Sequence, residues 1–467
     1  MNMRQNNPAS LKSAIVAAGN LSCFLAGPDT KSTWSELVQG SILEVHAVDL
    51  RGQSVLLAAA DQFRAAAALI ELDGVARRIV LYPSDLSAEH IAYVAKTAES
   101  SILVTDRPEI ASANHGVNHL IPVARNIAPA TKQSRPELET EWILLTSGTT
   151  GHSKLAVHTL SSLADSAWRR DPASASTVWS TFYDIRRYGG LHIFLHATLT
   201  GTSMVVSSAQ ESTADFLVRA GAHGVTHISG TPSHWRRALM SPMAGSIAPA
   251  YIRISGEIVD QAILNQIKAQ YPQTRVVHTF ASTEAGVGFY VNDGLMGFPP
   301  ELLHQNPKVD MKVEDGTIRI RSTRAAQRYL DTDAPPLKDA QGFVDTGDTV
   351  ELREGRYYFA GRRDGTINVG GFKIRPEEVE AVLNRHPLVA MSLVKAKKNP
   401  IVGALVVADV VLKSPPSEAA QESVAPIERE IQQFCRAELD AHKVPTAIHI
   451  VPMLTIGESG KLVRRNA

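Results

Sequence analysis

Apolar runs alternate with segments of helical periodicity over the first half of the chain. Four of these runs are typical of buried strands: residues 54–60, 78–82, 142–145 and 202–207. Three segments carry apolar side chains three and four positions apart, as amphipathic helices do: residues 62–72, 88–98 and 160–168. Such alternation of strands and helices is typical of α/β proteins, in which helices cover parallel sheets. The pattern therefore predicts βαβ layers.

The period changes to two between residues 309 and 321, with turn sequences at Asp315-Gly316 and Glu354-Gly355. We therefore expect an antiparallel, barrel-like region after the βαβ layers. A third pattern starts near residue 361 and predicts a small α+β domain. Its expected elements are a strand at 373–374, a helix at 376–384 that begins with proline, strands at 389–394 and 402–412, a flexible loop at 413–426 and a helix at 427–439. The predicted domains are residues 1–363 and 364–467.

Composition narrows the class of protein. The chain has 467 residues, 44% of them hydrophobic and 20% charged, which is ordinary for a globular protein and excludes global disorder. Lys plus Arg and Asp plus Glu both number 47, so no basic excess favours a protein that coats nucleic acid. Cys23 and Cys435 lack metal-site spacing and are expected to be reduced core thiols. We find no targeting segment and no apolar run of membrane-spanning length, which predicts a cytoplasmic location.

The strongest candidate for chemistry is the stretch from Thr146 to Lys154, which follows an apolar strand. Its hydroxyls and glycines allow backbone N–H and side-chain O–H groups to converge on phosphate oxygens, and Lys154 adds a positive charge. The spacing G-x-x-x-x-G-K-[ST] is absent, so the stretch is not a Walker loop. By itself the stretch favours a phosphate loop, and an ordinary strand-end turn is the alternative.

This loop resembles the phosphate loop of the adenylate-forming superfamily, which includes acyl- and aryl-CoA ligases, adenylation domains of peptide synthetases, and luciferases. Four further stretches resemble the family's motifs and occur in its order: Phe280-Ala281-Ser282-Thr283-Glu284, Thr346-Gly347-Asp348, Gly361 to Asp364 with Gly370 to Ile374, and Gly460-Lys461. Each motif alone would more often be a solvated turn. Their joint order over residues 146–461 makes the resemblance specific.

The resemblance implies a role for each matched residue. Glu284 would hold Mg²⁺, a hard cation that prefers carboxylate and phosphate oxygens, and Thr283 would contact the α-phosphate. Phe280 would stack on adenine, while Asp348 would accept hydrogen bonds from the ribose hydroxyls beside Arg362. The ATP- and AMP-binding residues implied in this way are Thr146, Ser147, Gly148, Thr149, Thr150, Gly151, Lys154, Phe280, Ala281, Ser282, Asp348 and Arg362.

Lys461 is the residue that the resemblance assigns to catalysis, together with Thr283 and Glu284. A cation that bridges the substrate carboxylate and the α-phosphate would offset the repulsion of two anions in the first half-reaction. Asp364 occupies the position of the family's hinge, about which the small domain would rotate between half-reactions. The thiol tunnel of the second half-reaction would be lined by Gly370, Gly371 and Phe372.

The acid substrate is the least determined part of the prediction. Asp184 stands near the position where many ligases carry histidine, and Ser153, Leu155 and Ala281 also depart from the family pattern. Asp184 would either meet a polar group of the substrate or act as an internal hydrogen-bond acceptor. The side chains expected to line the acid pocket are Tyr183, Asp184, His192, Ser255, Gly256 and Thr279. Their aromatic and polar character favours an aryl or short acyl acid.

The expected function is ATP- and Mg²⁺-dependent activation of a carboxylic acid to an acyl-adenylate, followed by transfer to the thiol of CoA. One alternative is an enzyme that loads the phosphopantetheine of an acyl or peptidyl carrier protein. An alternative from another class is a nucleotide-binding protein without turnover. The joint retention of Glu284, Asp348, Arg362 and Lys461 argues against that class.

Overall fold

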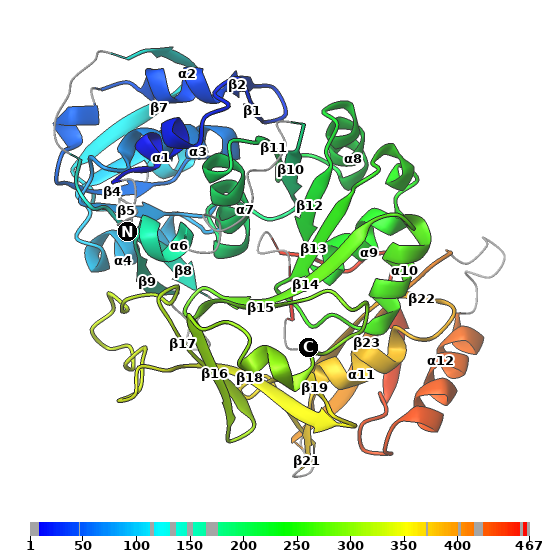
Figure 1. The fold of residues 1–467 in the computed structure, drawn as a ribbon. Helices are drawn as coiled ribbons and strands as arrows, with labels where there is room; N and C mark the ends of the chain where they lie inside the picture. The colour runs from blue at the N-terminus through cyan, green and yellow to red at the C-terminus, as the bar shows by residue number, and fades with distance from the viewer. Residues whose placement is uncertain are drawn as a thin grey trace.

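The structure, a computed structural model, describes residues 9–45, 47–112, 116–130, 137–146, 153–164, 176–369, 372–399, 403–414, 424–457 and 461–464. Two large, mainly parallel sheets form its upper part in Figure 1, and smaller antiparallel and mixed sheets lie below them. This is the α/β architecture that the sequence predicts. None of the helices in these stretches combines the length and the apolar character needed to cross a membrane.

The first large sheet has seven strands, with parallel strands inside and antiparallel strands at both edges. In spatial order they are β3 (Gly40–Leu43), β7 (His119–Pro129), β6 (Ile102–Thr105), β4 (Ser54–Leu57), β5 (Arg78–Leu81), β8 (Glu141–Thr146) and β9 (Lys154–His158). Helices α4 (Glu89–Thr97) and α5 (Pro108–Ala111) pack on one face in a compact apolar core. The strands predicted at 54–60, 78–82 and 142–145 are thereby confirmed.

The second large sheet has eight strands and is also parallel in its interior. In spatial order they are β15 (Gly286–Val291), β14 (Arg275–Ser282), β13 (Tyr251–Ser255), β12 (His227–Gly230), β10 (Val178–Thr181), β11 (Ser203–Val206), β1 (Phe24–Ala26) and β2 (Lys31–Thr33). Its outer face is covered by α8 (Thr213–Ala222), α9 (Pro232–Met240) and α10 (Gln261–Gln270). The strand predicted at 202–207 is β11.

A shared apolar core joins the two sheets, because the helices between them contribute side chains to both. These helices are α1 (Leu11–Ala18), α2 (Trp34–Gln39), α3 (Gln62–Leu72), α6 (Leu160–Ala164) and α7 (Tyr188–Leu199). Phe63 of α3 and Phe194 of α7 are both almost fully buried in this core. Figure 1 shows α7 between the cyan and green strands. Helix α3 has the predicted bounds, and Asp61 caps its first turn.

The antiparallel region is a four-stranded sheet of β16 (Val309–Glu314), β17 (Thr317–Ser322), β18 (Val344–Arg353) and β19 (Arg356–Arg362). Its two predicted hairpin turns are confirmed, since Asp315, Gly316, Glu354 and Gly355 all have positive φ. Among the described strands, β16 pairs only with β17 and β19 only with β18, apart from an isolated bridge between Tyr357 of β19 and Phe298, so the sheet has two edges. The predicted region is therefore an open sheet and not a closed barrel.

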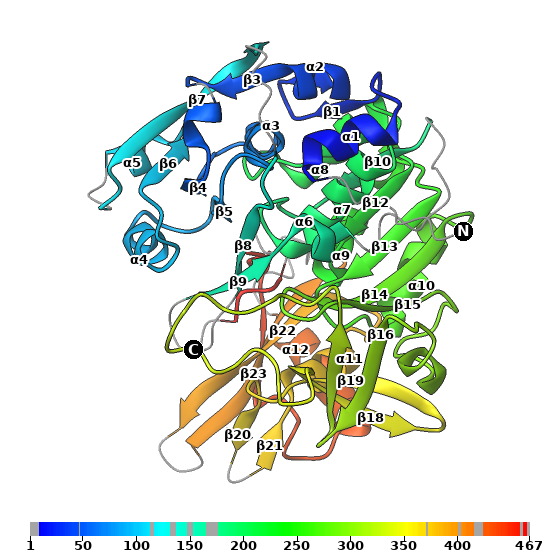
Figure 2. The same cartoon turned by 60° about the vertical axis from the view of Figure 1, so that its left-hand side comes forward.

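The C-terminal elements form a small α+β unit with its own core. They are the hairpin β20 (Ile367–Val369) and β21 (Phe372–Ile374), α11 (Pro376–Leu383), β22 (Val389–Asn399), β23 (Gly403–Leu412), α12 (Ala425–Glu438) and β24 (Ala447–Ile450). The predicted strands and helices of this part are confirmed, and α12 begins inside the stretch predicted as a loop, of which residues 415–423 lie outside the described residues. Figure 2 shows this unit on the same side of the large sheets as β16 to β19. Cys23 and Cys435 are both buried thiols, as expected.

Candidate active site

Residues 324–330 connect the two large sheets where β9 and β14 end. Ala326 N–H donates to the carbonyl of Glu284 (2.8 Å), and Gln327 N–H donates to the carbonyl of Val157 on β9 (2.8 Å). Backbone hydrogen bonds on both sides fix this segment between the sheets. Thr283 and Glu284 are thereby held beside the edge of the first sheet.

The candidate phosphate loop joins two antiparallel neighbours. Thr146 ends β8 and Lys154 begins β9, and the two residues are paired in register. The ammonium of Lys154 lies 5.2 Å from the ring centroid of Tyr329. The remaining candidates of this loop lie outside the described residues: Ser147, Gly148, Thr149, Thr150 and Gly151.

Four charged side chains from distant parts of the sequence come together here. Asp348 on β18 pairs in register with Arg362 on β19. Lys461 and Glu284 are both near enough to Asp348 to shift its pKa. Burial raises the pKa of Asp348 to about 6, although Arg362 and Lys461 act to lower it. The structure therefore brings Glu284, Asp348, Arg362 and Lys461 into one electrostatic cluster.

Arg362 is the cationic partner within this cluster. Its Nε donates to Oδ1 of Asp364 (3.3 Å). Burial acts to lower the pKa of Arg362, but the carboxylates of Asp348, Asp364 and Glu284 outweigh it and raise the pKa. Gly347 has φ +71°, and a Cβ at that position would lie 3.3 Å from Nη2 of Arg362. Glycine in the Thr-Gly-Asp sequence thus allows both the turn and the close approach of the guanidinium.

Two residues that support the cluster, Tyr329 and His158, were not predicted from the sequence. Tyr329 donates its hydroxyl to Oε1 of Glu284 (3.4 Å), and burial together with Glu284 raises the pKa of this tyrosine. Nε2 of His158 lies 2.8 Å from the carbonyl oxygen of Thr283. Burial lowers the pKa of His158 to about 4, so the ring is neutral and Nε2 must carry the proton that it donates. Tyr329 follows no periodic pattern, and His158 resembles an ordinary core histidine in the sequence.

The segment that carries Lys461 is docked on the N-terminal part of the chain. Leu462 N–H donates to Oε1 of Glu257 (3.0 Å), and Nη2 of Arg237 donates to the carbonyl of Leu454 (3.2 Å). Glu257 directly follows Gly256 at the end of β13. The exposed Lys461 is therefore positioned by contacts of its neighbours and not by an ion pair of its own among the described residues.

The predicted adenine-stacking residue, Phe280, is half-buried in an aromatic cluster. Its ring centroid lies 5.4 Å from that of Phe289 and 5.0 Å from that of Phe359. A register shift follows Phe280, after which Ala281 pairs with Val287. The hydroxyl of Ser282 accepts a hydrogen bond from the backbone N–H of Ala285 (3.0 Å). The adenine-binding role of this stretch stays a prediction.

The expected acid-pocket residues gather at the ends of β13 and β14. The hydroxyl of Tyr183 donates to the carbonyl of Ser255 (2.6 Å), and Gly256 has φ +87°. His192 on α7 is buried and contacts Arg253 of β13, and Thr279 on β14 is buried beside them. Asp184, by contrast, is paired with Arg186.

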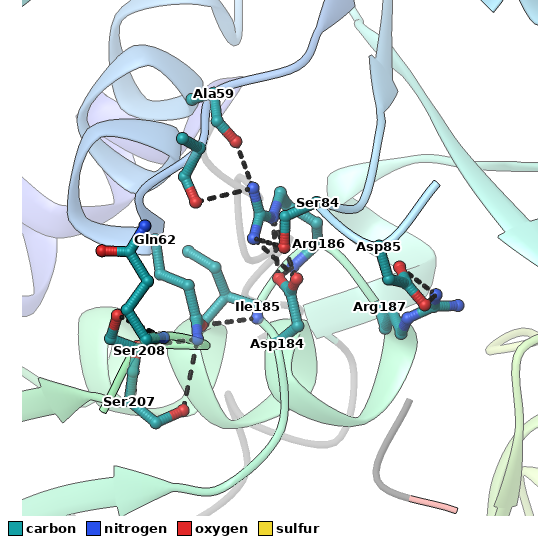
Figure 3. Close-up of polar contacts among 12 residues, drawn as sticks. Ala59, Gln62, Ser84, Asp85, Asp184, Ile185, Arg186, Arg187, Ser207 and Ser208 are labelled. Carbon is teal, nitrogen blue, oxygen red and sulfur yellow. Dashed lines mark hydrogen bonds and ion pairs between the residues drawn. The ribbon is translucent and has the colours of Figure 1, made fainter. Parts of the chain in front are cut away.

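Asp184 forms an internal ion pair that joins the two large sheets (Figure 3). Arg186 Nε donates to Oδ1 of Asp184 (2.8 Å) and Nη2 to Oδ2 (2.7 Å), and both side chains are buried. Arg186 also donates to the carbonyl of Ala59 and to the hydroxyl of Ser84 (3.0 Å), beyond β4 and β5 of the first sheet. The pKa of Asp184 is lowered, because Arg186 outweighs the effect of burial. Both carboxylate oxygens accept hydrogen bonds from Arg186, which favours the internal acceptor over a contact with the substrate.

Neighbouring side chains strengthen this joint. Gln62 accepts a hydrogen bond from Ile185 N–H (2.9 Å) and donates to the carbonyl of Ser207 (2.8 Å), as Figure 3 shows. Arg187 pairs with Asp85 at 2.5 Å. The contacts span β4, β5, β10 and β11, so they fix one large sheet against the other.

Of the described candidates for the second half-reaction, Phe372 is not part of the charged cluster. Phe372 is 56% exposed and stacks on His442, with ring centroids 4.5 Å apart. Gly370 and Gly371 lie outside the described residues. Asp364 is exposed and contacts Arg362. The roles of these residues as tunnel and hinge stay predictions.

The raised pKa of Asp348 predicts pH-dependent nucleoside binding. Only the ionised carboxylate accepts hydrogen bonds with both oxygens, and this form is lost as pH falls through about 6. We expect the Kd for adenosine, a probe without a titrating phosphate, to rise as pH drops from 7.5 to 5.5, as measured by calorimetry. Asp348→Asn should weaken binding about tenfold or more at pH 7.5, since a hydrogen bond to a charged group contributes about 1.5–3 kcal/mol. If the variant keeps the wild-type pH profile, Asp348 is not the group responsible.

The open α/β layers, the small C-terminal unit and the charged cluster between them are the features of an enzyme that binds a nucleotide. A family model for the AMP-binding enzyme matches residues 65–321, more than half of the chain. The model for the AMP-binding enzyme C-terminal domain matches residues 378–461. The chain belongs to the AMP-binding enzymes of the adenylate-forming superfamily.

Curated relatives include ligases of several acids. Acyl-coenzyme A synthetase ACSM4, mitochondrial, of Rattus norvegicus is 26% identical over 348 residues, which cover 69% of this chain and 59% of that protein. The match thus spans less than two thirds of that relative. The 2-succinylbenzoate–CoA ligase of Bacillus licheniformis is 26% identical over 420 residues, 83% of each chain.

Solved structures share the fold over nearly the whole chain. The anthranilate CoA ligase AuaEII in complex with anthranoyl-AMP has a TM-score of 0.81 at 19% identity, with 98% of this chain and 96% of that chain covered. A benzoate CoA ligase from Burkholderia xenovorans LB400 has a TM-score of 0.78 at 18% identity, with coverage of 97% and 98%. These similarities confirm the predicted fold class.

Proposed function

We propose that this protein activates a small carboxylic acid with ATP to an acyl-adenylate and then transfers the acyl group to the thiol of CoA. The observation that carries the proposal is the convergence of Glu284, Asp348, Arg362 and Lys461, four motif residues from separate parts of the chain. In an ion pair with a purely structural role, each charge is normally neutralised by its partner. Here Lys461 is exposed at the edge of the cluster, where it is available to a ligand.

In the first half-reaction, a carboxylate oxygen of the acid attacks the α-phosphorus of ATP, and the bond to pyrophosphate breaks. Lys461 would neutralise the two anions as they approach, and Thr283 would donate its hydroxyl to the α-phosphate. Asp348 and Arg362 would hold the ribose. His158 positions Thr283 through the carbonyl contact, and Tyr329 positions Glu284.

In the second half-reaction, the thiol of CoA attacks the acyl carbon, loses its proton, and AMP leaves. Curated relatives named as CoA ligases support CoA as the acceptor. A carrier-protein phosphopantetheine carries the same thiol arm and is the alternative acceptor. We propose that Asp364 is the hinge and that residues 370–372 line the path of this arm.

Glu284 fits a magnesium ion through the chemistry of its donor atoms. Among the described residues, no group of three or more His, Cys, Asp or Glu side chains forms a metal cage. Mg²⁺ is normally held by one or two carboxylates together with substrate phosphates, so one glutamate beside the phosphate loop is a suitable donor set. When bound, the ion would reduce the charge of the ATP phosphates.

Replacing Glu284 with glutamine tests this assignment. The amide keeps the shape of the side chain and its contact with Tyr329 but removes the negative charge. We expect the Mg²⁺ concentration for half-maximal pyrophosphate release to rise at least tenfold, since even outer-shell changes commonly cost about 10–100-fold in metal affinity. Glu301→Gln, which alters a residue outside the cluster, is the control. An unchanged Mg²⁺ dependence would mean that another residue binds the metal.

The decisive test of the proposed function is pyrophosphate release across a panel of aryl and short acyl acids, with and without CoA. Release that depends on the acid, with a thioester product in the presence of CoA, supports the proposal. Acid-dependent release without thioester, followed by loading of a phosphopantetheinylated carrier protein, would favour the alternative acceptor. ATP binding without release for any acid would favour a non-catalytic nucleotide-binding protein.

A further inference from the structure

A layer of buried polar side chains lies between the second large sheet and α7. Register partners on neighbouring parallel strands point to the same face, and so do residues two apart on one strand. Ser229 pairs with Arg253, and Ser255 pairs with Thr279. All four side chains therefore share one face, and the contact of Arg253 with His192 shows that this face looks toward α7.

Three atoms of this layer lack a hydrogen-bond partner among the described residues. They are Nε of Arg253, Oγ1 of Thr279 and Oγ of Ser229. Arg253 is only 3% exposed, Thr279 8% and Ser229 1%. Buried polar atoms are nearly always hydrogen-bonded, and a group without a partner is costly. Three such atoms on adjacent strands indicate a place prepared for a polar group that the described chain does not supply.

The charge of Arg253 identifies the kind of group. The described residues include no carboxylate paired with this guanidinium, in contrast to the buried Arg186, which has Asp184. Burial acts to lower the pKa of Arg253, while Tyr290, Tyr251 and other tyrosines raise it. Tyrosines are neutral at pH 7, so they do not compensate a full positive charge. A buried cation without a counter-charge favours a ligand that brings oxygen acceptors.

The neighbours of Arg253 fix its orientation. Nη1 lies 3.1 Å from Nδ1 of His192, and since arginine only donates, Nδ1 is the acceptor and His192 is neutral. The guanidinium lies 5.1 Å from the ring centroid of Tyr290, which pairs with Thr279 across β14 and β15. These contacts hold the guanidinium on the same face as the hydroxyl of Thr279.

We infer that the acid activated by this enzyme carries a second oxygen substituent, a ring hydroxyl or a second carboxylate, which Arg253 and Thr279 bind. The inference rests on the proposed function, because Ser255 and Thr279 belong both to this layer and to the proposed acid pocket. Arg253 donates to the substituent oxygen. The hydroxyl of Thr279 donates to it as well, or accepts from a phenolic hydroxyl. Arg253 is thus a specificity-determining residue for the first half-reaction.

The test compares kcat/KM for pyrophosphate release with benzoate, 3- and 4-hydroxybenzoate, isophthalate and terephthalate. We expect at least one oxygen-substituted acid to exceed benzoate about tenfold or more, the range of a charge-assisted hydrogen bond. The two hydroxybenzoates and the two dicarboxylates distinguish a hydroxyl from a carboxylate. This comparison requires only the wild-type protein.

Variants then test whether Arg253 causes the preference for oxygen-substituted acids. In Arg253→Met the ratio of substituted acid to benzoate should fall to about one, whereas Arg253→Lys, which keeps the charge, should retain part of it. Thr279→Val should lower the ratio less. Arg275→Met, which removes an exposed cation from the same sheet, should leave the ratio unchanged. A ratio is used because a merely structural loss would lower all rates together.

The possible results distinguish failure of this inference from failure of the proposed function. Equal kcat/KM for benzoate and for every substituted acid would overturn this inference and leave the proposed function intact. A preference that survives in Arg253→Met would also overturn it. Failure of wild-type protein to release pyrophosphate with these acids and with short aliphatic acids would overturn the proposed function together with the inference.

Discussion

Lys461→Ala is expected to slow acyl-adenylate formation by about 10²–10³, the cost of removing one oriented charge-stabilising group from a transition state. Lys461 lies within electrostatic reach of Asp348, and its neighbour Leu462 is anchored on Glu257, so the lysine is held where nucleotide and acid would meet. ATP binding should be largely retained, because Asp348, Arg362 and the phosphate loop are untouched. The measurements are ATP–pyrophosphate exchange for the rate and equilibrium dialysis for ATP affinity.

A matched variant controls for the loss of any lysine from the small domain. Lys398 is exposed on β22, away from the cluster, and Lys398→Ala should exchange pyrophosphate at the wild-type rate. Near-normal exchange in Lys461→Ala would remove this residue from catalysis. Equal losses in both variants would point to a general effect of charge on the small domain.

Local patterns predicted the elements of the fold well because the information lies within each segment. Helix α3 carries its own cap at Asp61, and the 309–322 hairpin carries residues that tolerate positive φ at its turn. The pairing of β1 with β11 depends on contacts between residues about 180 positions apart, such as Leu25 with Met204. No local period encodes such a pairing. The open edges of the β16 to β19 sheet likewise depend on strand order, so a barrel-like region was a reasonable but wrong expectation.

The sequence predicted those residues of the candidate site that belong to family motifs. Glu284, Asp348, Arg362 and Lys461 follow the order of the resemblance, and the structure brings them together. Tyr329 and Arg253 belong to no motif. Only the folded structure shows that Tyr329 contacts Glu284 and that Arg253 contacts His192. Asp184 shows the reverse case, in which a residue near a motif position is recruited by Arg186 to join the two large sheets.

The small C-terminal unit holds candidates for both half-reactions. Lys461 is within reach of Asp348, whereas Phe372 is exposed and stacked on His442. In this orientation Phe372 is therefore not presented to the cluster. If Phe372 and its neighbours line the thiol path, the unit must turn relative to the nucleotide, and Asp364, two residues beyond the end of β19, is the proposed position of that turn.

Asp364→Pro is accordingly expected to separate the two half-reactions. Proline fixes φ near about −65° and cannot absorb a large backbone change, so the small unit should stay in the orientation that presents Lys461. Acyl-adenylate formation should remain within a few-fold of wild type. Thioester formation from pre-formed acyl-adenylate should fall on the order of 10², the cost of misplacing reacting groups by about 1 Å or more. Single-turnover assays of each step measure the two rates separately.

Asp364→Asn is the matched control, because it removes the charge that faces Arg362 at 3.3 Å but leaves the backbone free to turn. It should carry out both steps at close to wild-type rates. If asparagine and proline impair thioester formation equally, the contact with Arg362 is what matters, and position 364 is not the hinge. If proline slows both half-reactions to the same degree, the small unit does not change orientation between them, and the thiol must reach the acyl-adenylate in the arrangement that presents Lys461.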